Sequence, residues 1–109
     1  MPDVELLWWE GCPSTENALN QLREALDELG LSAAEITSTE IRTDEDARTA
    51  RFIGSPTIRV DGVDVVPPPA EEPCGLNCRI YRRRDGRISP TPDPEDIRDA
   101  LKRATEVTT

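Results

Sequence analysis

The chain has 109 residues, a length that suits one domain, residues 1–109, built around one hydrophobic core. Its net charge of −9 argues against nucleic acid or membrane partners, because nucleic acids and anionic membranes both select cationic surfaces. Histidine is absent, which excludes every mechanism that needs a histidine base or a histidine metal ligand.

The first residues carry no basic segment, and their apolar run is too short for a secretory signal peptide. No stretch approaches the length of a membrane-spanning helix. We therefore expect a cytoplasmic protein. In the cytoplasm most disulfides are transient and catalytic rather than structural.

The first half of the chain predicts strand, helix, strand and helix. Residues 4–9 form a short apolar strand that ends before Gly11. A helix is expected over about residues 13–29, with Pro13 in its first turn. The apolar residues of this helix share one face: Leu19, Leu22, Leu26 and Leu29. Residues 34–41 are rich in β-branched types and predict a second strand.

A short second helix should follow an N-cap at Thr43, carry Ala47, Ala50 and Phe52, and stop near Gly54. Residues 57–60 and 63–66 predict a hairpin around Asp61–Gly62. Residues 67–92 are proline-rich and irregular, with an optional short strand over 79–82 that turns at Asp85–Gly86. A last helix is expected from Asp93, and the tail 105–109 should fray.

The resulting order is β-α-β-α-β-β-α, which belongs to the α/β class. The first crossover implies parallel strands, and the Asp-Gly hairpin implies an antiparallel pair. We therefore expect a mixed sheet of four strands with helices on both faces.

Cys12 lies directly after the first strand and at the start of the first helix. Free backbone N–H groups and the positive end of the helix dipole stabilise a thiolate at such a position. Many thiol oxidoreductases carry a second cysteine three positions on, where this chain has Thr15. The Thr15 hydroxyl could donate a hydrogen bond to the sulfur, but it cannot act as a resolving thiol. If Trp8 and Trp9 both belong to the strand, they point to opposite sides of the sheet, so that one is core and the other could lie beside the site; the alternative, which we favour, is that both serve packing.

Cys12-Pro13 at the first strand–helix junction, together with Ser55-Pro56-Thr57 before a later strand, resembles the thioredoxin-like superfamily. The resemblance covers nearly the whole chain and is closest to small, glutaredoxin-sized bacterial members. It implies a four-stranded sheet of order 2-1-3-4, with the first and last helices on one face and the middle helix on the other. The chain also resembles, more distantly, small bacterial proteins described as alkylmercury-lyase-like.

Carried onto this sequence, the resemblance implies that Cys12 is the nucleophile and that Pro56 follows a cis peptide bond beside the sulfur. Ser55 would offer its backbone to a bound substrate strand, and Trp9 and Pro13 would flank the bound substrate. Thr15 departs from the dithiol pattern of the family, so exchange within the motif is in question. No cofactor is implied.

Two further cysteines, Cys74 and Cys78, lie within the proline-rich segment. Three functional interpretations stay open: a local disulfide between them, resolution of an intermediate on Cys12 by one of them, or a soft-metal site formed by all three sulfurs. The alternative to all three is that the cysteines are free, buried thiols in a fold without activity, since free cysteine often packs as a small apolar residue.

The leading hypothesis is a thiol–disulfide oxidoreductase in which Cys12 attacks a protein or small-molecule disulfide. Cys74, Cys78 or an external thiol would then resolve the mixed disulfide. The alternatives are a soft-metal or organomercurial binder, and a non-catalytic interaction module. A basic cluster could be a solvated turn or a docking patch for an anion. Its members are Arg79, Arg82, Arg83, Arg84 and Arg87.

Overall fold

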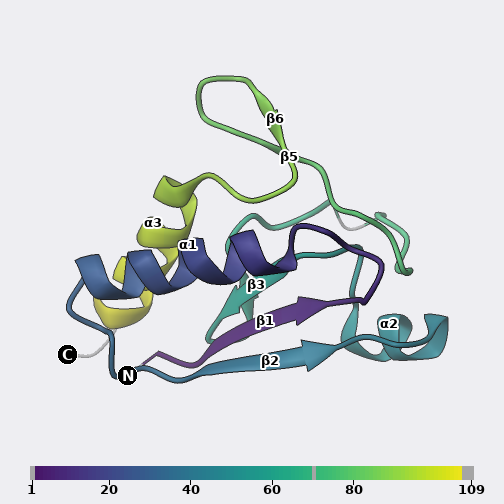
Figure 1. Ribbon diagram of the computed structural model, residues 1–109, viewed down its shortest axis with the longest axis horizontal. Coiled ribbons are helices and arrows are strands. Elements are labelled where there is room, and N and C mark those ends of the chain that lie inside the picture. The colour runs from purple at the N-terminus through teal and green to yellow at the C-terminus, as the bar shows by residue number, and fades with distance from the viewer. Residues whose placement is uncertain (1, 70, 107–109) are drawn as a thin grey trace.

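The computed structural model describes residues 2–69 and 71–106 (Figure 1). Its helices and strands are β1 (Val4–Trp8), α1 (Thr15–Glu28), β2 (Ile36–Glu40), α2 (Asp44–Ala50), β3 (Thr57–Val60), β4 (Val63–Asp64), β5 (Tyr81–Arg82), β6 (Ile88–Ser89) and α3 (Pro94–Glu106). No helix in these two ranges is both long and apolar enough to cross a membrane.

Four strands form one mixed sheet in the order β2-β1-β3-β4, which confirms the predicted α/β class and strand order. β1 pairs in parallel with β2, because α1 crosses over between them. β3 runs antiparallel to β1 and to β4. The β3–β4 turn contains Asp61 and Gly62, both at positive φ, as an Asp-Gly hairpin requires.

Alternation along β1 divides the interior into two clusters. Leu6 faces α1 and α3, where it packs with Leu22 and Leu101. Leu7 faces the other side of the sheet, where it packs with Ala47 of α2 and with Phe52. Successive side chains of a strand point to opposite faces, so the apolar run of β1 is buried from both sides. Helices therefore cover both faces of the sheet.

The ends of two helices differ from the prediction. α1 begins at Thr15 rather than near Pro13, which leaves Cys12 in the turn before the helix. α2 has the predicted cap, since the Thr43 side chain accepts a hydrogen bond from the Asp46 N–H at 3.0 Å. It ends at Ala50 because Arg51 adopts the left-handed conformation, so Phe52 enters the core from outside the helix.

The hairpin and the C-terminal end also differ from the prediction. β4 spans only Val63–Asp64, because the Asp64 side chain accepts a hydrogen bond from the Val66 N–H and turns the chain. α3 continues through Glu106, beyond the expected start of fraying at residue 105. The rest of that expectation falls on residues 107–109, outside the described residues.

The proline-rich segment forms a small unit of its own beside the sheet. Its strands β5 and β6 pair with each other and not with the main sheet, so the expected strand over 79–82 shortens to Tyr81–Arg82. The turn between them contains Gly86 at φ 93°, a conformation that suits glycine. In Figure 1 this hairpin projects from the top of the molecule, away from β1 and β2.

Candidate active site

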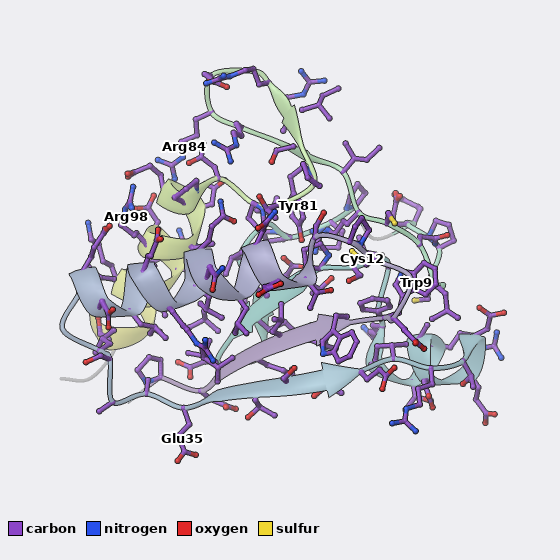
Figure 2. All side chains as sticks on the ribbon, in the orientation of Figure 1. Trp9, Cys12, Glu35, Tyr81, Arg84 and Arg98 are labelled. Carbon is purple, nitrogen blue, oxygen red and sulfur yellow. The ribbon has the colours of Figure 1, made fainter. Side chains whose placement is uncertain are left out.

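Cys12 occupies the turn between β1 and α1. Its backbone N–H donates to the Trp9 carbonyl at 3.0 Å, which closes this turn. The side chain is buried, with 9% exposure, and its thiol donates a hydrogen bond to the Ser55 carbonyl oxygen at 3.4 Å. In the view of Figure 2, Cys12 lies between Trp9 and Tyr81. The first strand–helix junction is therefore joined to the segment that precedes β3.

These contacts revise the expected surroundings of the sulfur. A carbonyl oxygen only accepts hydrogen bonds, so the Cys12 sulfur is the donor in its contact with Ser55. The predicted hydrogen bond from Thr15 is not formed, and within the described residues the buried Thr15 hydroxyl has no hydrogen-bond partner. Pro13, the expected substrate contact in this turn, is exposed.

The Ser55–Pro56 bond is cis, and both residues are buried next to Cys12. The backbone of Ser55 is fully engaged by another part of the chain. Its N–H donates to the Asn77 carbonyl at 2.8 Å, and its carbonyl accepts from the Arg79 N–H at 2.9 Å. These two bonds form a parallel bridge between Ser55 and Cys78. The backbone groups that we expected to bind a substrate strand thus bind the proline-rich segment instead.

This bridge places Cys78 beside Cys12. Cys78 is exposed, yet the pKa of its thiol is raised, first by partial desolvation and then by the neighbouring Cys12 sulfur. The two sulfurs belong to residues 66 positions apart, and the bridge at Ser55 joins the segments that carry them. Cys12 and Cys78 are therefore the pair of thiols that the fold brings together.

Cys74 lies in a different environment. It is half-buried and packs against the cluster that contains Leu7 and Phe52. All three cysteines are free thiols. In the two described ranges, no three His, Cys, Asp or Glu side chains come together as metal ligands. Cys74 therefore packs as a small apolar residue.

Trp9 fixes the position of the segment that carries Cys78. Its indole N–H donates to the Asn77 carbonyl at 3.0 Å, so this oxygen accepts hydrogen bonds from both Trp9 and Ser55. The ring lies directly over Gly11, where a Cβ would come within 2.2 Å of it. Gly54 is less restricted, since a Cβ there would lie 3.1 Å from the Asn77 carbonyl oxygen, a tight contact. Both glycines permit the close approach.

The two tryptophans do not divide into a core residue and a site residue, because neither is fully buried. Trp8 is half-buried against the α1 and α3 side of the sheet, and its indole N–H donates to the Ser38 hydroxyl at 2.8 Å. Trp9 is half-buried against the opposite cluster. The placement of Trp9 beside the site is as expected, but its partner is the protein's own chain.

A buried network anchors the residue that follows Cys78. The Arg79 guanidinium forms an ion pair with Asp64 at 2.6 Å and donates to the Thr57 hydroxyl and to the Val66 carbonyl. It also lies over the Tyr81 ring, with Cζ 4.5 Å from the ring centroid. This side chain is only 7% exposed. The network attaches the proline-rich segment to β3 and β4.

Tyr81 is a second attachment of the proline-rich segment to the cis-proline. Its hydroxyl donates to the Pro56 carbonyl at 2.5 Å. Burial raises the pKa of Tyr81 well above its usual range, so the group stays a hydrogen-bond donor. The cis peptide segment is therefore held by Cys12 and Arg79 at the Ser55 carbonyl and by Tyr81 at the Pro56 carbonyl.

Sequence reasoning did not identify Asn77, Arg79 and Tyr81 as site residues. It grouped Arg79 with a basic surface cluster, yet Arg79 and Tyr81 are buried while Ile80 and Arg82 between and after them are exposed. In the sequence, residues 79–82 alternate as a strand would, but a buried arginine beside an exposed isoleucine reverses the usual pattern of apolar residues inside and charged residues outside.

Two of the other four arginines of the cluster form ion pairs with aspartates of the chain. Arg84 pairs with Asp96 and Asp99 of α3, and Arg87 pairs with Asp85. These ion pairs favour the solvated-turn interpretation over a docking patch for an anion.

Comparisons of the chain with protein-family models, with curated proteins and with solved structures found no match.

Proposed function

We propose that the protein is a thioredoxin-like thiol–disulfide oxidoreductase whose redox pair is Cys12 and Cys78. The observation that carries this proposal is that Ser55 contacts both residues: its carbonyl accepts from the Cys12 thiol, and its backbone forms the parallel bridge with Cys78. Two cysteines held against the same residue are suitably placed to form a disulfide when they are oxidised. The second sulfur that Thr15 cannot supply would then come from the proline-rich segment.

The thioredoxin-like assignment is supported by three features that the resemblance implied. The sheet has the order 2-1-3-4, Cys12 follows the first strand, and a cis bond at Ser55–Pro56 lies beside the Cys12 sulfur. The proline-rich segment is an addition to that framework. Its function in the proposal is to carry a cysteine to the position opposite Ser55.

The net reaction consumes the two thiols and one substrate disulfide. Both thiols lose their protons and, together, two electrons, and a disulfide forms between Cys12 and Cys78. The substrate disulfide accepts the two electrons and leaves as two thiols. An external thiol reductant regenerates the enzyme by the reverse exchange. The balance requires no additional cofactor.

The two alternative functions receive less support. A soft-metal site of three thiolates would need Cys74 beside Cys12 and Cys78, whereas Cys74 packs against a separate cluster. An interaction module would need a free edge at Ser55, and that backbone already pairs with residues 77 and 79. The oxidoreductase proposal uses the sulfur geometry and leaves the Ser55 bridge intact.

A disulfide-reduction assay tests the proposal. The wild-type protein, supplied with an external dithiol, should reduce a disulfide substrate catalytically. Cys12→Ser should lower the rate by roughly 10²-fold or more, because one half of the redox pair is lost. The isosteric hydroxyl can still donate to the Ser55 carbonyl, so the fold should be retained, which circular dichroism would verify. Equal rates for the wild type and a folded Cys12→Ser variant would contradict the proposal.

A further inference from the structure

The two thiols of the proposed pair differ in their access to solvent. Cys12 is 9% exposed, and it lies beneath the bridge that joins Ser55 to Cys78. Cys78 is exposed, and it lines an open cavity of about 380 Å³. The prolines of the segment form much of the wall of this cavity, together with Ile80 and Tyr81. A substrate can therefore reach Cys78 without any rearrangement of the chain.

The route for an extended peptide to Cys12 is already filled. A substrate strand beside the cis-proline would need the N–H and the carbonyl of Ser55, and these are bonded to Asn77 and Arg79. Displacing that segment would also break the Trp9–Asn77 hydrogen bond and the buried Arg79–Asp64 ion pair. Separating a buried ion pair leaves each charge without its partner, which is strongly unfavourable. Peptide binding at this position is thus strongly opposed.

The volume of the cavity fits a small ligand. Ligand sites in proteins occupy about 300–1,000 Å³, and the cavity at Cys78 lies at the lower end of that range. Its wall combines three consecutive prolines, Pro67 to Pro69, with polar residues that include Glu72 and Arg82. A compact disulfide of low molecular weight would fit beside the sulfur.

From this geometry we infer that Cys78 is the thiol that attacks the substrate, that the substrate is a small disulfide bound in the Cys78 cavity, and that Cys12 is the resolving thiol. The inference rests on the proposed function and specifies its substrate class. It assigns Cys12 and Cys78 the opposite order from the one that the family resemblance implies.

The exchange then proceeds in two balanced steps. The Cys78 thiolate attacks one sulfur of the substrate disulfide, a mixed disulfide forms on Cys78, and the first substrate thiolate leaves and takes up a proton from water. Cys12 then loses its proton and attacks the Cys78 sulfur, which forms the Cys12–Cys78 disulfide and expels the second substrate thiolate. The two electrons lost by the pair equal those gained by the substrate.

Bis(2-hydroxyethyl) disulfide, which is small and uncharged, is the probe for the experiment. All variants carry Cys74→Ser, so that only the proposed pair can react. With Cys12→Ser added, the protein should release one equivalent of thiol and keep a stable mixed disulfide on Cys78. With Cys78→Ser added, the mixed disulfide on Cys12 should form about tenfold or more slowly, because that sulfur is covered. Mass spectrometry of peptides locates each adduct.

Two outcomes overturn the inference while leaving the proposed function intact. One is a Cys78→Ser variant that reacts at Cys12 as fast as the Cys12→Ser variant reacts at Cys78. The other is faster turnover of an extended peptide disulfide than of bis(2-hydroxyethyl) disulfide by the protein with both thiols. Failure of the proposed function looks different, since the Cys74→Ser protein would then form no Cys12–Cys78 disulfide with either substrate.

Discussion

Cys74 and Cys78 lie four positions apart in one proline-rich segment, yet they have very different surroundings. Cys74 is half-buried and packs against the cluster that contains Phe52. Cys78 is exposed, lines a cavity and interacts with the Cys12 thiol. Composition does not distinguish these two residues; the way in which the segment pairs with Ser55 does.

Backbone pairing determines which of the two cysteines lies opposite Ser55. Asn77 and Arg79 bind the two backbone groups of Ser55, so the residue between them is the one held opposite Ser55. A shift of the segment by one residue would place a different side chain there and remove Cys78 from Cys12. The anchors on either side, Trp9 and Asp64, therefore matter to the chemistry although neither carries sulfur.

The largest expected effect separates the two cysteines directly. Cys78→Ser should lower disulfide-reductase turnover by roughly 10²-fold or more, because it removes one member of the proposed pair. Cys74→Ser should leave turnover within about twofold of the wild type, since Cys74 belongs to a packing cluster. Steady-state assays with an external dithiol measure both. A Cys74→Ser variant that loses as much activity as Cys78→Ser would remove the distinction between them.

The next effect concerns the anchor that follows Cys78. Arg79→Ala should lower the free energy of unfolding by about 3–5 kcal/mol, because Asp64 would be left largely buried without its partner. Urea denaturation followed by circular dichroism gives the value. Arg84→Ala is the matched control. Arg84, like Arg79, forms ion pairs with aspartate, here with Asp96 and Asp99, but its side chain is well exposed, so the urea midpoint of this variant should barely move. Similar losses for both variants would argue against the Arg79 network as an anchor.

A smaller effect is expected at the anchor that precedes Cys78. Trp9→Phe keeps an aromatic ring over Gly11 but loses the N–H that binds the Asn77 carbonyl, at a cost of about 0.5–1.5 kcal/mol. Formation of the Cys12–Cys78 disulfide should slow as the segment loosens. Trp8→Phe loses a comparable bond, to Ser38 on the other face of the sheet, and should leave that rate unchanged. Equal rates of disulfide formation for the two variants would contradict the positioning role of Trp9.

The mildest test uses pH. Because the pKa of Cys78 is raised and the thiolate is the reactive form, its alkylation rate should keep rising at pH values where a free thiol has already reached its plateau. In Cys12→Ser the midpoint should move downward, since the neighbouring thiol no longer contributes. It should stay above that of a free thiol, because desolvation is the larger cause. Iodoacetamide labelling of Cys78 across a pH series would follow both proteins, and a midpoint below that of a free thiol would refute this account.

Much of the framework was predictable from the sequence. The mixed sheet follows from an apolar strand, a leucine-striped helix and an Asp-Gly hairpin, each of which is a local pattern, whereas its strand order is the one that the family resemblance implied. The cap at Thr43 was also recognisable, because N-capping depends on neighbouring residues alone. The position of Cys12 after the first strand and the cis bond before Thr57 agree with the family resemblance.

The completion of the site was not predictable, because it depends on contacts between distant residues. The Ser55–Cys78 bridge joins residues 23 positions apart, and no local pattern marks that pairing. Arg79 was misassigned to the surface since its buried partner, Asp64, lies at the end of another strand. The hydrogen bond that Thr15 could have donated to Cys12 is not formed, and the Cys12 thiol bonds to Ser55 instead. Ser55 is distant in the sequence, so local propensity and spacing do not indicate this partner.

The most direct test of the central claim is to map the disulfide that forms when the reduced wild-type protein is oxidised. All three cysteines are present and free to compete, so the fold alone decides which pair forms. Proteolysis under acidic, thiol-blocked conditions followed by mass spectrometry should recover a peptide pair linked through Cys12 and Cys78, with Cys74 alkylated. A linkage between Cys74 and Cys78, or three alkylated cysteines after full oxidant treatment, would contradict the account.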